Sequence, residues 1–100
     1  MGLNYIDVYQ QNDKGIICDV SGLVNLDGYR PAFTVKKSLD GTPVIEKDGS
    51  ASGLQISFNL TYEDTSIAAG NYIYDIVIDN STNRYTVAQD DFTVLDSVKY

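Results

Sequence analysis

The sequence contains no histidine and no tryptophan, and only one cysteine and two prolines among its 100 residues. The missing histidine excludes Ser-His-Asp and Cys-His nucleophilic sites, a histidine general base and most zinc sites, because each of these needs an imidazole. The single cysteine, Cys18, excludes an intrachain disulfide. It alternates with Ile16 and Val20, so we expect a buried and inert thiol, the alternative being a reactive or intermolecular one.

Basic residues are also scarce. Seven Lys and Arg stand against fourteen Asp and Glu, which gives a net charge of −7. This balance argues against a nucleic-acid or anionic-membrane surface, since both need clustered cations. No apolar run approaches membrane-spanning length. The opening "MGLNYI" has neither the pattern of a secretory signal nor the Ser or Thr of a myristoylation signal, so we expect folding in a reducing cytoplasm.

The sequence also offers no clear phosphate-binding, carboxylate or calcium site. The eight glycines are isolated in turns and form no phosphate loop. The carboxylates at 63–64 and 90–91 could be imagined as a glycosidase pair, but adjacent acids are typical of turns and helix starts. "DNSTN" and "DGSASG" offer calcium ligands without calcium-loop spacing, so a structural metal is only an alternative. We therefore expect no enzyme activity, no catalytic residues, no cofactor and no metal site.

What the sequence does contain is a strand pattern. Short apolar segments separated by turns every eight to twelve residues or so are typical of an all-β sandwich. Residues 29–37 alternate, with Pro31 expected to place the strand's start at an edge or a bulge. "DGSASG" is expected to be a loop and "TYEDTSIAAG" to form one helical turn. We predict a single domain, residues 1–100, with about seven antiparallel strands.

The pattern is strongest in a hairpin of two strands, 71–79 and 83–89, joined by a loop at 79–82. This register pairs Ile76 with Tyr85 and Tyr74 with Val87, and it keeps Asp75 off the buried face. The expected inner face is Tyr72, Tyr74, Ile76, Ile78, Tyr85 and Val87. The expected outer face has Ile73, Val77 and Ala88 around Asp75, Arg84 and Thr86.

A tyrosine at the start of the first hairpin strand resembles the tyrosine corner of immunoglobulin-like domains. There a tyrosine hydroxyl hydrogen-bonds to nearby backbone while its ring fills the core. Tyr72 is the candidate, and Tyr74 is the second choice. The alternative is that a large amphipathic ring simply suits a half-buried strand.

The outward aliphatic side chains admit two interpretations. A contiguous apolar strip on a sheet face often marks a contact patch. Alternatively, a loop or the first strand covers it. We expect a surface for a partner or for self-association, whose candidate residues are Ile73, Asp75, Val77, Arg84, Ala88, Tyr5, Tyr9 and Tyr100.

From residue 26 onward, four motifs stand in a fixed order. They are L-x-G-Y (Leu26, Gly28, Tyr29), T-x-E-D-T (Thr61, Glu63, Asp64, Thr65), A-G-x-Y-x-Y-D (Ala69, Gly70, Tyr72, Tyr74, Asp75) and F-T-V (Phe92, Thr93, Val94). This order resembles the immunoglobulin-like domains of tailed-bacteriophage virion proteins, among them the amino-terminal domain of upper baseplate proteins, head fibres and capsid decorations. The resemblance covers most of residues 23–95.

The resemblance implies an immunoglobulin-like β-sandwich that acts as a non-enzymatic structural subunit of a virion assembled in the host cytoplasm. Its implied partners are other virion proteins of the capsid or tail, and further copies of itself in a homo-oligomer. Because the sequence given stops at Tyr100, a head-fibre or capsid-decoration subunit is favoured over a baseplate or tail subunit. Two competing interpretations are a carbohydrate- or receptor-binding module that stacks sugars on Tyr85 or Tyr62, and a small hydrolase.

Overall fold

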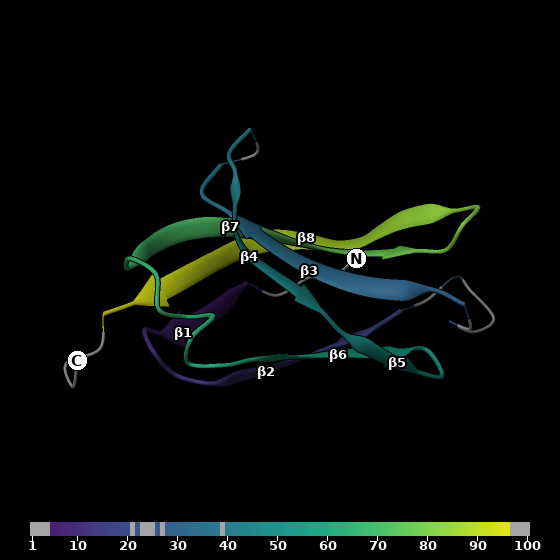
Figure 1. Cartoon of the computed structure of the whole chain (residues 1–100), viewed down its shortest axis with the longest axis horizontal. Helices are drawn as coiled ribbons and strands as arrows, with labels where there is room; N and C mark the ends of the chain where they lie inside the picture. The colour runs from purple at the N-terminus through teal and green to yellow at the C-terminus, as the bar shows by residue number, and fades with distance from the viewer. Residues whose placement is uncertain (1–4, 21, 23–25, 27, 39, 97–100) are drawn as a thin grey trace.

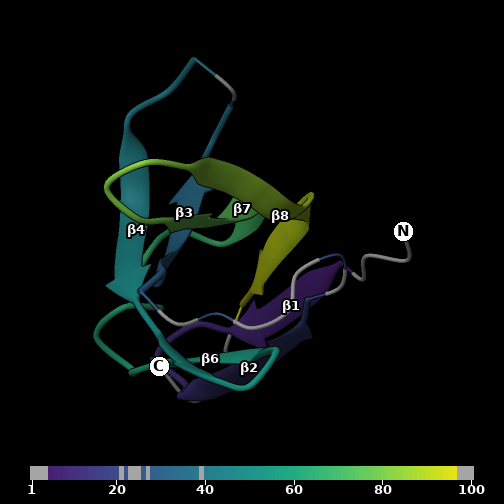
Figure 2. The ribbon, with the colours of Figure 1, turned by 90° about the vertical axis from the view of Figure 1, so that its right-hand side faces the viewer.

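The structure is a computed structural model that describes residues 5–20, 22, 26, 28–38 and 40–96. These residues form eight strands in two packed layers (Figures 1 and 2). The strands are β1 (Ile6–Tyr9), β2 (Lys14–Asp19), β3 (Arg30–Lys36), β4 (Pro43–Asp48), β5 (Ser50–Ser52), β6 (Gln55–Leu60), β7 (Gly70–Asp79) and β8 (Arg84–Leu95). The described part of the chain has no helix that is long and apolar enough to cross a membrane.

The order of the strands identifies the fold class. One sheet has the order β1-β8-β7-β3-β4, and the other has the order β2-β6-β5. Counted along the chain, the second, fifth and sixth strands thus lie in one layer, and the third, seventh and eighth lie in the other. This partition is that of an immunoglobulin-like sandwich, whose B, D and E strands face C, F and G. The predicted fold class is therefore confirmed.

Side-chain alternation builds one core between the sheets. Along β7, every second residue from Tyr72 to Ile78 is buried. Phe33 in β3 is fully buried, and its ring centroid lies 5.5 Å from that of Phe58 in the opposite sheet and 5.9 Å from that of Phe92. Burying each such side chain is worth about 1.5–3 kcal/mol, so this contact between layers is a main source of stability.

The chain changes sheets between β4 and β5, which differs from the predicted loop at "DGSASG". β4 lies at the edge of the five-stranded sheet, and β5 begins two residues after β4 ends, at the edge of the other (Figure 1). Gly49 makes this crossing. A Cβ at this position would lie 2.5 Å from the Phe58 ring and 2.5 Å from the backbone oxygen of Ser57, so only glycine fits here without displacement.

Pro31 lies at the start of its strand, as predicted, but the strand is not at an edge. β3 pairs with β7 on one side and β4 on the other. The oxygen of Pro31 accepts a hydrogen bond from Gly49 N–H at 3.1 Å, and pairing with β4 begins only at Ala32. The N–H that proline lacks would point to this same side, beyond the end of β4, so its absence costs no ladder hydrogen bond.

The hairpin has a four-residue loop, but it is shifted by one residue from the prediction. Asp79 pairs with Arg84 and Ile78 with Tyr85, because the side chain of Asn80 closes the turn. Asn80 Oδ1 accepts hydrogen bonds from the N–H groups of Thr82 and Asn83, at 2.7 and 2.6 Å. This Asx geometry starts the turn at residue 80.

A second difference corrects the predicted position of Ala88. Val77 pairs with Thr86, yet Ile76 pairs with Ala88, so Val87 is the extra residue of a β-bulge. The bulge reverses the alternation of β8. Ala88, expected on the outer face, is consequently buried with 3% of its surface exposed. The predicted strand 83–89 and the later "DFTVLD" segment are one strand of twelve residues.

The expectation of a wholly antiparallel sandwich is wrong at one edge. β1 pairs with β8 in parallel, with Ile6 opposite Phe92 and Tyr9 opposite Leu95. The pairing continues one residue further, where Gln10 N–H donates to the oxygen of Leu95 at 2.9 Å. β1 therefore extends the five-stranded sheet sideways and buries Val8.

Candidate functional site

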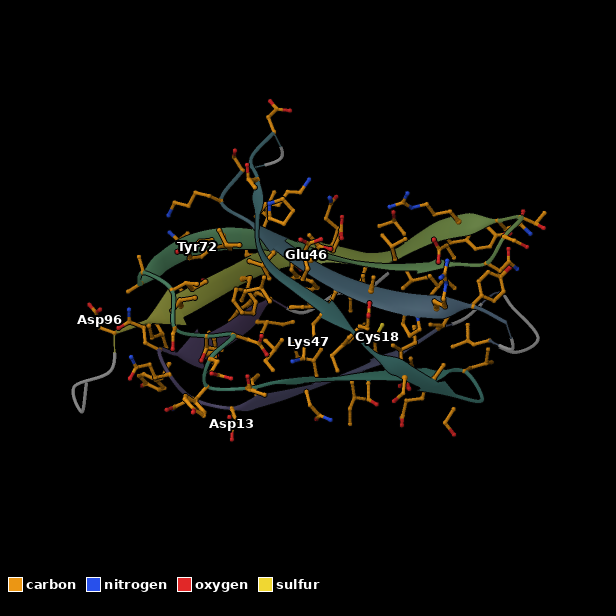
Figure 3. All side chains as sticks on the ribbon, in the orientation of Figure 1. Asp13, Cys18, Glu46, Lys47, Tyr72 and Asp96 are labelled. Atoms are coloured by element: carbon orange, nitrogen blue, oxygen red, sulfur yellow. The ribbon has the colours of Figure 1, made fainter. Side chains whose placement is uncertain are left out.

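The tyrosine corner is present at Tyr72. Its hydroxyl donates a hydrogen bond to the oxygen of Ala68, four residues upstream, at 2.7 Å, while its side chain is buried at the start of β7. Lys37 Nζ lies 4.7 Å from the centroid of its ring, in cation–π geometry. Figure 3 shows Tyr72 among the side chains of the five-stranded sheet, to which β7 belongs. The prediction is confirmed, and the role of the residue is structural.

The T-x-E-D-T motif forms a hydrogen-bonded turn of the expected kind. Thr65 N–H donates to the oxygen of Thr61 at 3.2 Å. Asp64 Oδ2 accepts from Thr61 N–H at 2.8 Å, and Asp64 N–H is 3.4 Å from Thr61 Oγ1, which is the reciprocal arrangement of a capping box. Thr65 is fully buried and donates its hydroxyl proton to the oxygen of Asn12 at 2.8 Å, which fastens the turn to the loop before β2.

Lys47 reaches this turn from β4. Its Nζ donates to Asp64 Oδ2 at 2.9 Å, and both side chains are mostly buried. Figure 3 shows Lys47 between the two sheets. Burial raises the pKa of Asp64, but hydrogen bonds from Thr61 N–H, Lys47 and the Thr61 hydroxyl outweigh it, and the net pKa lies below its ordinary value. The Asp64 carboxylate therefore has a structural role, since it accepts the hydrogen bonds that stabilise the turn.

The acidic residues considered above as an imaginable glycosidase pair have different surroundings in the structure. Asp90 and Asp91 point to opposite faces of β8, since Asp90 pairs with the inward Tyr74 and Asp91 with the outward Ile73. Asp64 is engaged as described above. Within the ranges that the structure describes, no group of three or more Cys, Asp and Glu side chains could hold a metal ion. The "DNSTN" segment instead closes the hairpin turn.

Cys18 is half-buried on the inner side of β2 and packs against the core. Burial first, and the nearby carboxylate of Asp19 second, raise the pKa of its thiol. Burial likewise raises the pKa of the inward Tyr74, with the charge of Asp90 adding to the effect. Both shifts favour the neutral forms, which agrees with the expectation of an inert thiol.

Three residues of the predicted interface lie together on the outer face of the five-stranded sheet. Ile73, Asp75 and Val77 lie side by side on that face of β7, each partly buried and partly exposed. Val77 stands between Ala32 of β3 and Thr86 of β8. β1 lies beside β8 in the same sheet rather than over this face, so the first strand does not cover it.

The other members of the predicted interface have different positions. Arg84 is exposed at the hairpin end, opposite Asp79. Tyr9 is 53% exposed on the outer side of β1, and Tyr5 is 67% exposed just before that strand. Ala88 belongs to the core. Tyr100 lies outside the described residues.

A feature that the sequence did not indicate is a groove at the end of the sandwich where β4 crosses to β5. Its volume is about 650 Å³, and it is open to solvent. Its walls come from the start of β3, the crossing at 48–51 and the end of β7. The lining includes Tyr29, Arg30, Asp48, Ser50 and Asp79, together with the buried Leu26.

Two tyrosines stand beside this groove. Tyr29 lines it, and its ring centroid lies 6.1 Å from that of Tyr85 at an interplanar angle of 45°. Tyr85 faces inward as predicted, but it lies near the open end of the hairpin and is 42% exposed. The exposure of Tyr85 follows from its place near the end of the hairpin, which the position of the turn determines. Sequence alternation alone does not predict that position. Arg30 Nε and Asp79 Oδ1 form an exposed ion pair at 3.6 Å on the same rim.

Comparison with known proteins adds a fold similarity. No protein-family model matches the sequence, and no curated protein matches it. Among solved structures, the chain is similar to a protein from Bacteroides vulgatus provisionally assigned as a glycoside hydrolase, with a TM-score of 0.60 and 14% identity. That similarity covers 94% of this chain but only 17% of that protein's length. Murine CRIg is similar at a TM-score of 0.44 and 11% identity, over 93% of this chain and 92% of that one. The first similarity shows the fold alone.

Proposed function

We propose that this chain is a non-enzymatic contact domain that serves as an accessory structural subunit of a tailed-phage virion, as a head fibre or capsid decoration. Its partners are other virion proteins and further copies of the chain, and its assembly takes place in the host cytoplasm. A baseplate or tail subunit is the alternative position.

The observation that carries the contact role is the outer face of the five-stranded sheet. Ile73 and Val77 are partly exposed on a central strand, and covering the exposed part of such aliphatic side chains would contribute to affinity. Asp75 stands between them, and charges in such a patch fix register more than strength. The proposal thus places a protein, rather than a nucleic acid, against this face.

The virion assignment is supported by the order of the sequence motifs. T-x-E-D-T builds the capped turn before β7, and A-G-x-Y-x-Y-D builds the tyrosine corner and the strand that presents the outer face. F-T-V pairs with β1. These motifs therefore occupy the points that determine the sandwich, which agrees with a family pattern that is structural.

Sedimentation of the purified chain tests the contact role. We expect an oligomer, and we expect Val77→Glu to lower its mass without unfolding the chain, because the introduced charge would have to be desolvated in the contact. Ile17→Glu is the matched control, since Ile17 is an exposed aliphatic residue (67%) on the outer face of the other sheet. Unchanged mass for Val77→Glu, or equal loss for Ile17→Glu, would contradict the interface.

Labelling tests the virion role separately. An antibody against the chain should bind intact phage particles at fixed positions, which also distinguishes head from tail. Particles that carry no label would overturn the virion assignment while leaving the contact surface standing.

A further inference from the structure

We propose that the groove at the β4–β5 crossing binds a neutral glycan. The proposal does not depend on the virion assignment or on the outer face of the five-stranded sheet. It depends on the groove's shape, on the tyrosine pair at its side and on the charges of its rim.

The groove has the size and the framework of a ligand site. Its volume of about 650 Å³ lies within the range typical of small-molecule sites. Most of its lining comes from strands, and Gly49 fixes the crossing because no larger residue fits against Phe58. A ligand would therefore meet walls that are already in place, which lowers the entropy lost on binding.

The tyrosine pair supplies an aromatic surface. Tyr29 forms part of the wall, and Tyr85 leans against it with 42% of its surface exposed. Exposed aromatic rings beside polar groups suit ligands with one apolar and one hydroxylated side. A pyranose ring has this character, since its C–H face can cover an aromatic ring while its hydroxyl groups point outward.

The rim supplies the hydrogen-bonding groups. Asp48 and Asp79 offer carboxylate acceptors, Arg30 offers guanidinium donors, and Ser50 offers a hydroxyl. The Arg30–Asp79 pair is 3.6 Å long, beyond hydrogen-bond distance, and the Arg30 side chain is 81% exposed. Both groups can therefore turn toward a ligand, and planar carboxylate and guanidinium groups can each engage two neighbouring hydroxyls.

The charge balance selects against anionic ligands. Two carboxylates and one guanidinium line the rim, and the whole chain carries −7. A nucleotide or a sulfated or sialylated sugar would be repelled, whereas a neutral oligosaccharide would not. The ligand class is therefore a glycan without charged groups.

A glycan array followed by NMR titration tests the proposal. The full chain, tetramerised on streptavidin, is applied to an array of neutral, sialylated and sulfated glycans, and the chain labelled with ¹⁵N is titrated with the strongest neutral glycan and with cellohexaose, maltohexaose and chitohexaose. We expect neutral glycans to bind, with amide shifts at Arg30, Gly49, Ser50 and Asp79. Tyr85→Ala and Asp48→Asn should each weaken binding about tenfold or more.

Tyr62→Ala is the control, because Tyr62 is a comparably exposed tyrosine (59%) that lines a different hollow beside residues 11–13. It should leave glycan binding unchanged, and all three variants should keep the wild-type circular-dichroism spectrum. No binding of any neutral glycan at millimolar concentration, shifts confined to other residues, binding of charged glycans alone, or equal loss in Tyr62→Ala would each overturn the proposal. Val77→Glu should not alter glycan binding, so this outcome and that of the contact role remain distinguishable.

Discussion

Tyr72 shows at the scale of a single residue why this domain uses tyrosine where an aliphatic residue would fill the same space. The ring packs in the core, and the hydroxyl satisfies the oxygen of Ala68, which belongs to the loop that enters β7. A phenylalanine would fill the core equally well but would leave that backbone acceptor without its partner. The hydroxyl thus joins a loop to the core.

Tyr72→Phe should therefore lower the free energy of unfolding by about 0.5–1.5 kcal/mol, the usual net contribution of one hydrogen bond, because Ala68 is exposed and water can reach its oxygen. Urea denaturation followed by circular dichroism measures this change. Tyr85→Phe is the control, since Tyr85 is 42% exposed, and it should change stability by less than about 0.5 kcal/mol. Equal effects of the two substitutions would contradict a special role for the corner.

The corner could be predicted because its signal is local: a tyrosine at a strand start, preceded by a loop of small and acidic residues. Tyr85 was harder to predict. Its inward direction followed from alternation, but its exposure depends on where the turn begins and on which residues lie opposite. The side chain of Asn80 determines where the turn begins, and the ring of Tyr29 lies against that of Tyr85. Tyr29 is far from Tyr85 in the sequence, so local patterns do not contain this contact.

At the scale of strands, the β4–β5 crossing depends on the lack of a side chain at one position. Gly49→Ala should destabilise the domain by about 1–3 kcal/mol, because the new Cβ would lie 2.5 Å from both the Phe58 ring and the backbone of Ser57. Thermal unfolding measures the loss. Gly15→Ala is the matched control in β2, where a Cβ would have its nearest neighbour at 3.9 Å. A wild-type melting temperature for Gly49→Ala would refute the close contact.

The turn at residues 61–65 should give a pH-dependent contribution to stability. The folded pKa of Asp64 is lowered, so its contribution is fully present above the ordinary carboxyl pKa and is lost as pH falls through the lowered folded value. Asp64→Asn should therefore cost about 1 kcal/mol or more at pH 7. The difference from wild type should shrink toward acid.

Urea denaturation at a series of pH values between 7 and about 2 checks this prediction. Glu63→Gln is the control on the same turn, since Glu63 is exposed and takes no part in the cap. A stability difference for Asp64→Asn that stays constant across this range would show that the charge is not what matters.

The alternation of apolar and polar residues predicted which side chains face inward in most strands, but not in β8. One extra residue, Val87, reverses which side chains of that strand face inward, and it places Ala88 in the core. Sequence alternation on both sides of a bulge looks regular when each side is read alone. The position of the bulge depends on pairing with β7, which local patterns do not contain. The groove was unpredicted for the same reason, because its walls come from segments far apart in the chain.

At the scale of the whole molecule, the two sheets share one core and should unfold together. Ile56 is fully buried in the three-stranded sheet, and Ile56→Val should cost about 0.5–1.5 kcal/mol. Tyrosine fluorescence reports largely on the other sheet, which holds Tyr72 and Tyr74, whereas far-UV circular dichroism reports on both. We expect the substitution to shift both transitions equally. Separate midpoints would mean that the layers are independent.

The parallel pairing of β1 with β8 has a mechanical consequence. Ile6–Tyr9 and Phe92–Leu95 run in the same direction side by side, so a force that pulls the chain's two ends apart slides these strands along each other. Their hydrogen bonds are then loaded in shear and must rupture together, whereas an antiparallel hairpin pulled at its open end unzips one bond at a time. Tension along the chain therefore meets its main resistance at the place where the first strand lies against the last.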